Sequence, residues 1–108
     1  MSWIVEYSTQ AKQDLRNIFE YIAYNLLEPE TAGRQVQRIM KEIRLLNEMP
    51  LRHRLYDGKP WQSQGLRFVP VNNYLVFYVP IDEKNCVSIV RIIYGGRDIR
   101  KQLSETIE

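Results

Sequence analysis

The sequence has few of the residues that hold small proteins together covalently or through a metal. It contains one cysteine, Cys86, and one histidine, His53, in 108 residues. An internal disulfide needs two cysteines, and the usual zinc sites need several Cys and His ligands, so neither can be assembled within this chain. We therefore expect no structural metal, no cofactor, and a fold held by its hydrophobic core.

Long apolar runs are also missing. No run approaches the roughly 18 residues that a membrane-spanning helix needs, and residues 1–10 lack the basic and then apolar regions of a signal peptide. The contents of 44% hydrophobic and 26% charged residues, with five glycines and five prolines, are ordinary for a globular protein and exclude low complexity. We expect a cytoplasmic protein without membrane contact that forms one domain over residues 1–108.

The formal net charge of +2 at pH 7 is unevenly distributed. Residues 1–49 carry a formal charge of −1, residues 50–104 carry +5, and Glu105 and Glu108 make the tail acidic. A basic second half is typical of a surface for a polyanion or an acidic protein, although basic patches also occur on proteins that bind neither. Charge alone therefore leaves the partner open.

The first half of the chain predicts a strand followed by two helices. Alternating apolar residues predict a short strand within residues 1–7. Ser8 is a suitable helix N-cap, and apolar residues at three- and four-residue steps predict a first helix over about residues 9–26. A second amphipathic helix begins at Pro29 and ends before Pro50. Because the connection is short, the two helices should pack as an antiparallel hairpin.

The second half predicts an irregular loop followed by strands. Residues 50–65 have no periodicity and combine proline, glycine and basic residues with Trp61. Three strands are predicted at residues 66–71, 74–79 and 86–94, and the turn-forming residues between them indicate an antiparallel meander. Ile99 and Leu103, two apolar residues four positions apart, favour a short final helix near the C-terminus.

The resulting order, β-α-α-β-β-β with a short C-terminal helix, predicts a two-layer α+β domain. The helical hairpin should cover one face of the sheet, because each helix has one apolar stripe and one polar face. We expect the other face to stay partly open, where cations would form a binding surface. Trp61 either closes the edge of the core or anchors a partner, and Cys86 is expected as a small apolar residue.

Several short segments carry a resemblance to a known family. They are VEYSTQA at residues 5–11, IFEYI at 18–22, LR at 66–67, NY and VFY within 73–78, and VRIIYGGRD at 90–98. Their order and spacing across nearly the whole chain resemble the RelE/ParE superfamily of type II toxins. The resemblance implies a bacterial toxin, of a kind associated with plasmid stabilization, that a cognate antitoxin protein neutralises.

The resemblance implies two alternative targets. ParE-like members inhibit DNA gyrase, whereas RelE-like members cut mRNA on the ribosome without a metal. For a nuclease, four residues are the candidate catalytic set: Arg67, Arg91, Tyr94 and Arg97. The arginines would neutralise the charge that develops on the phosphate, and the tyrosine would stack on a base or transfer a proton.

Two departures from the RelE pattern favour gyrase inhibition. RelE-like nucleases place an arginine after the tyrosine that opens the central strand, whereas Leu75 follows Tyr74 here. The lysine pair of that branch is also missing ahead of this strand, and loss of one such cation commonly lowers the rate about a hundredfold or more. The long helical hairpin also resembles the ParE branch. The alternatives are a ribosome-dependent mRNA endonuclease and a non-toxic binding adaptor with the same fold.

Overall fold

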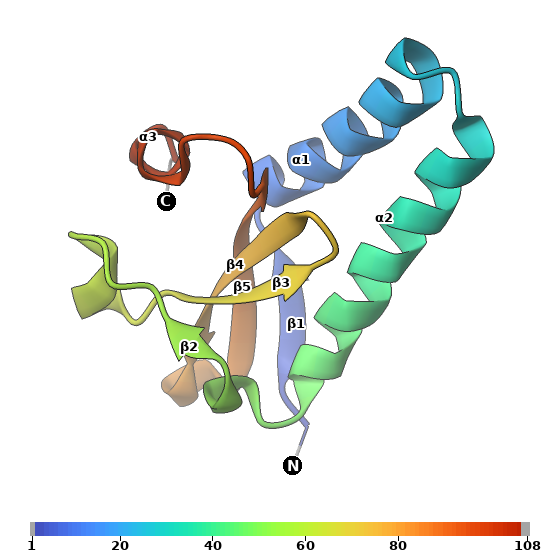
Figure 1. Ribbon diagram of the computed structural model, residues 1–108. Coiled ribbons are helices and arrows are strands. Elements are labelled where there is room, and N and C mark those ends of the chain that lie inside the picture. Colours follow the sequence, from blue (N-terminus) through green and yellow to red (C-terminus); the bar gives the residue numbers. More distant parts are fainter. Residues whose placement is uncertain (1, 107–108) are drawn as a thin grey trace.

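The computed structural model describes residues 2–106, and it places a helical hairpin against a five-stranded sheet (Figure 1). The elements are β1 (Ile4–Tyr7), α1 (Thr9–Glu20), α2 (Pro29–Arg44), β2 (Arg54–Leu55), β3 (Arg67–Val71), β4 (Tyr74–Ile81), β5 (Cys86–Tyr94) and α3 (Ile99–Ser104). The predicted α+β class and order of elements are confirmed. β2 is an addition, because it lies in the stretch that was expected to be an irregular loop.

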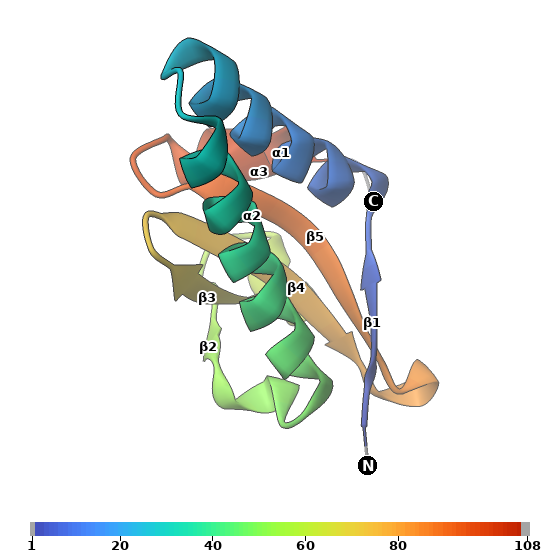
Figure 2. The same ribbon diagram turned by 90° about the vertical axis from the view of Figure 1, so that its right-hand side faces the viewer.

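The strands follow the order β1-β5-β4-β3-β2 across the sheet. The pairings of β2 with β3, β3 with β4, and β4 with β5 are antiparallel, as a meander requires, whereas β1 pairs with β5 in parallel. A parallel neighbour needs a long crossover connection, and the helical hairpin begins that connection. Figure 2 shows β1 at one edge of the sheet, with α2 lying over the face of the other strands.

Ser8 begins α1 in the way its side chain predicts. Its Oγ accepts a hydrogen bond from the Ala11 N–H at 2.9 Å and donates one to the Val90 carbonyl at 2.8 Å. One hydroxyl therefore caps the helix and ties it to β5. After α1, a wider helical turn at Tyr21–Asn25 continues the first helix, and α2 begins with Pro29 at its N-terminus.

The apolar stripes of the hairpin pack on one face of the sheet. Buried residues of this first core come from both helices and from β3, β4 and β5, and include Ala11, Ile39, Ile43, Val76, Tyr78, Val87 and Ile89. The Tyr78 hydroxyl donates a hydrogen bond of 2.6 Å to the Pro50 carbonyl. Burial raises the pKa of Tyr78 to about 12, so the phenol stays protonated and keeps this bond.

The second face of the sheet is covered, so the prediction that it stays open is wrong. A second buried cluster lies there, formed by Trp61, Leu66, Phe77, Ile93 and Leu103. Trp61 comes from the segment before β3 and Leu103 from α3, so these two segments form a further layer. The reason is that neighbouring Phe77 and Tyr78 are both fully buried although they point to opposite faces, so both faces of β4 need cover.

Candidate functional site

The predicted arginines do not share one face of the sheet. Directly opposed residues of an antiparallel pair point to the same face. Arg67 lies opposite Tyr78 of the first core, and Arg91 lies opposite Phe77 of the second core. Arg67 and Arg91 therefore belong to opposite faces. The expectation that they line one open surface is wrong, because the alternation of β4 separates them.

Arg67 holds the segment that follows α2. Its Nη1 donates hydrogen bonds to the carbonyls of Leu51 at 3.0 Å and His53 at 2.5 Å. Burial, followed by the positive charge of Arg52, lowers the pKa of His53 below its ordinary value of 6.5, and Arg67 contributes in the same direction. The imidazole is therefore neutral at physiological pH. The structural role of Arg67 is to hold the backbone of Leu51 and His53 through its hydrogen bonds.

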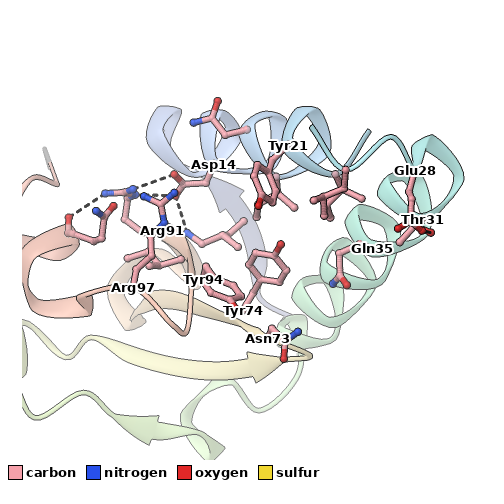
Figure 3. Close-up of a pocket in the computed structure, with 17 residues that line it drawn as sticks. Asp14, Tyr21, Glu28, Thr31, Gln35, Asn73, Tyr74, Arg91, Tyr94 and Arg97 are labelled. Carbon is pink, nitrogen blue, oxygen red and sulfur yellow. Dashed lines mark hydrogen bonds and ion pairs between the residues drawn. The ribbon is translucent and has the colours of Figure 1, made fainter. Parts of the chain in front are cut away.

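Arg91 links three elements of the fold. Its Nε and Nη2 donate to the Asp14 carboxylate at 2.8 and 3.1 Å (Figure 3). Its Nη1 donates to the Gln102 carbonyl at 3.1 Å and to Thr106 Oγ1 at 3.2 Å. Only 9% of Arg91 is exposed. Each nitrogen of the guanidinium group is thus engaged within the chain, where it joins β5 to α1 and to the end of α3.

A groove of about 630 Å³ opens between the hairpin and the neighbouring ends of β4 and β5. Ile18, Tyr21 and Leu26 line it from the hairpin, while Tyr74 and Tyr94 line it from the sheet (Figure 3). Tyr21 is 54% exposed, Leu26 50% and Tyr94 47%. Large apolar side chains that stay exposed around a concave surface mark an interaction site. We call this surface the aromatic groove.

Two tyrosines and a double glycine shape the sheet side of the aromatic groove. Tyr74 and Tyr94 lie opposite each other, with ring centroids 5.7 Å apart and ring planes at 67°. The Tyr94 ring leans over Gly96, where a Cβ atom would lie 2.5 Å from its Cε2. The chain turns here through a 3.0 Å hydrogen bond from the Arg97 N–H to the Tyr94 carbonyl. The double glycine therefore allows a tight turn and brings the exposed Arg97 to the groove.

The aromatic groove offers hydrogen-bond donors from Tyr74 and Gln35 beside the carboxylates of Asp14 and Glu28. Burial raises the pKa of Tyr74, and the adjacent Tyr94 and Tyr21 raise it further, so its hydroxyl is neutral and cannot act as a base near pH 7. Gln35 Oε1 accepts a hydrogen bond from Asn72 at 3.2 Å, while its buried Nε2 has no partner among residues 2–106. An unpaired buried donor is costly, and a bound carbonyl would satisfy it.

The described residues contain neither a cluster of metal ligands nor a membrane-spanning helix. Within residues 2–106, no three or more His, Cys, Asp or Glu side chains come together to hold a metal ion. No helix in that range has both the length and the apolar character needed to cross a bilayer.

Comparison with known proteins places the chain in a family. A model of the ParE toxin of the type II toxin–antitoxin system parDE matches residues 5–99. The chain belongs to the ParE toxin family. The resemblance to the RelE/ParE superfamily is thereby confirmed. A search of curated proteins found no significant match.

Solved structures share the ParE-family fold at low sequence identity. A chain of the chromosomal ParDE system from P. aeruginosa is 21% identical, with 86% of this chain and 96% of that chain covered and a TM-score of 0.69. A chain of the RelBE2 complex from Mycobacterium tuberculosis is 20% identical, with 87% of this chain and 92% of that chain covered and a TM-score of 0.62. A free double mutant of the E. coli toxin RelE is 16% identical, with 97% and 94% covered and a TM-score of 0.67. These similarities show a common fold.

The hairpin side of the groove in this ParE-family member was not among the predicted site residues. Of the four candidates, Arg91, Tyr94 and Arg97 border the aromatic groove, whereas Arg67 lies elsewhere. The sequence did contain a signal for this surface. The end of the first helix carries more large apolar residues than a single buried stripe can bury. These exposed residues are Tyr21, Tyr24, Leu26 and Leu27.

Proposed function

We propose that this ParE-family member is the toxin of a parDE-type system, and that it inhibits DNA gyrase in the cytoplasm. The observation that carries the proposal is the match of residues 5–99 to the ParE toxin model. The roles of Arg67 and Arg91 in holding the fold add support. A metal-independent nuclease needs several free cations aimed at one phosphate, and these two guanidinium groups are committed on opposite faces of the sheet.

Two assays run side by side test the target. In the first, purified gyrase supercoils relaxed plasmid in the presence of the protein; in the second, translating ribosomes are tested for mRNA cleavage. We expect lost supercoiling and intact RNA. Ribosome-dependent cleavage that Arg97→Ala abolishes would overturn the proposal and favour the nuclease alternative. Arg100→Ala is the matched control, because it removes an exposed arginine nearby. Normal growth during expression of folded protein would leave the adaptor alternative.

We further propose that the cognate antitoxin binds in the aromatic groove. The exposed Tyr21, Leu26 and Tyr94 offer apolar surface, and Gln35 Nε2 offers a donor to a backbone carbonyl. Arg97 places a positive charge at the same groove. These features suit an extended or helical segment with apolar anchors and carboxylates. Such a segment would cover apolar surface that the chain itself leaves in water.

A further inference from the structure

α2 carries a row of cations on the side that faces away from the sheet. The row consists of Arg34, Arg38, Lys41 and Arg44. Their three- and four-residue spacing places them on one side of the helix, and all four are exposed. Ile39 and Ile43 are fully buried against the sheet, which directs the row outward. Figures 1 and 2 show α2 beside α1 over that face of the sheet, with no other element of residues 2–106 on its outer side. We call these residues the basic row.

No direct ion pair within residues 2–106 involves the basic row. The row borders a shallow groove of about 590 Å³, whose other lining residues are Thr31, Gln35, Gln37 and Asn72. No carboxylate lines this groove. Among residues 2–106 the ion pair is that of Arg91 with Asp14, and none forms in the basic row. Arg34 donates a hydrogen bond to Thr31 Oγ1 at 3.3 Å, and Thr31 Oγ1 donates one to the Glu28 carboxylate at 3.1 Å, so Glu28 reaches this end of the row only through Thr31.

The composition of this second groove favours a nucleic acid over a protein. Stable protein interfaces have an apolar or aromatic centre from which water is excluded, and this groove is lined by cationic, amide and hydroxyl side chains. Phosphate backbones are bound by Arg and Lys together with Thr, Asn and Gln side chains. The aromatic groove shares Thr31 and Gln35 with this groove, but it also has large apolar and aromatic side chains such as Ile18, Leu26 and Tyr94. The two grooves are therefore suited to chemically different partners.

The geometry of the row favours duplex DNA. Its eleven residues, from Arg34 to Arg44, cover about 15 Å of helix, and duplex DNA carries a negative charge about every 1.7 Å along its axis. An exposed α-helix fits the wide major groove of B-form DNA, whereas the A-form RNA groove is too narrow. We propose that the basic row binds the phosphate backbone of duplex DNA. This proposal goes beyond gyrase inhibition, because it requires neither gyrase nor antitoxin.

The test is a salt series of fluorescence anisotropy with the full-length protein and a labelled 20-base-pair DNA duplex. Four phosphate contacts predict that log K falls with log salt with a slope of about −3.6. Arg38→Gln with Lys41→Gln should reduce the slope to about −1.8 and weaken binding about sixtyfold at 0.1 M salt. Glutamine is a good helix former, so α2 should persist, as circular dichroism will verify.

The matched control is Lys12→Gln with Arg16→Gln, which removes one exposed lysine and one exposed arginine from α1. We expect this control to bind DNA within about twofold of the unmodified protein, since α1 makes no phosphate contact in the proposal. Equal losses in both double variants would overturn the proposal, as would no binding at 0.05 M salt. Tighter binding to a single-stranded RNA of equal charge, or lost antitoxin binding with unchanged DNA affinity, would also overturn it. Gyrase inhibition is measured separately, so either proposal can fail alone.

Discussion

Asp14 and Arg91, which lie 77 residues apart in the sequence, form a buried ion pair with two hydrogen bonds of 2.8 and 3.1 Å. The Asp14 carboxylate also accepts the Ile92 backbone N–H at 2.8 Å. β1 pairs with β5 only as far as Ile89, so this N–H lies beyond the paired part of that edge. The Asp14 carboxylate thus accepts the free Ile92 N–H at the edge of β5, and it also neutralises Arg91, which holds α3.

Removal of Asp14 should destabilise the protein strongly. We expect Asp14→Ala to lower the free energy of unfolding by roughly 3–5 kcal/mol, because Arg91 would remain as a buried charge without its partner. The double variant Asp14→Leu with Arg91→Met should lose less than the sum of the single losses. Urea unfolding followed by tryptophan fluorescence measures both. A loss below about 1 kcal/mol for each single variant, with a double variant that loses the sum of the two, would contradict a coupled pair.

Stability should depend on pH through His53. Burial and Arg52 lower the pKa of this imidazole in the folded protein below 6.5, so the unfolded chain takes up the proton first as pH falls. Its contribution to stability is therefore present above about pH 6.5, and it decreases below that pH until the folded pKa is reached. When the pH is lowered from about 8 to about 5.5, the melting temperature of His53→Gln should fall less than that of the unmodified protein. Identical pH profiles for the two proteins would show that His53 has no such role.

Introducing the RelE-type cation at Leu75 should weaken the fold. Leu75 lies opposite Ile93 and packs against the second core. Leu75→Arg should lower the free energy of unfolding by more than about 1 kcal/mol, because apolar contact is lost and a charge is placed against the covered face. Leu75→Met is the control and should cost less than about 1 kcal/mol. Equal stability of the two variants by chemical denaturation would mean that this face is open.

Antitoxin binding should depend on Leu26 in the aromatic groove. Leu26→Asp should weaken binding to the purified cognate antitoxin about tenfold or more, because an interfacial apolar contact becomes a desolvated charge. Leu55→Asp is the matched control, since Leu55 is 47% exposed and Leu26 50%, and Leu55 lies outside the groove lining. Titration calorimetry measures both affinities, and thermal unfolding checks that both variants fold. Similar affinities would place the antitoxin on another surface.

Much of the fold could be predicted because its signals are local. The Ser8 cap and the start of α2 at Pro29 each depend on backbone chemistry within a few residues. The helices and the meander follow from apolar spacing over one or two turns or a few alternations. β2 escaped prediction, because its two residues gain strand geometry only from pairing with Arg67 and Phe68.

The sequence by itself determined the family, the order of the elements and the faces of the two helices, because these depend on residue types and spacings that act over short distances. Tertiary structure decided where the strand residues point and which partners they find. Arg91 is separated from Asp14 by most of the chain, and Trp61 is buried because both faces of β4 are apolar. Such contacts depend on strand register and on which segments return to cover the sheet, and no local pattern contains that information.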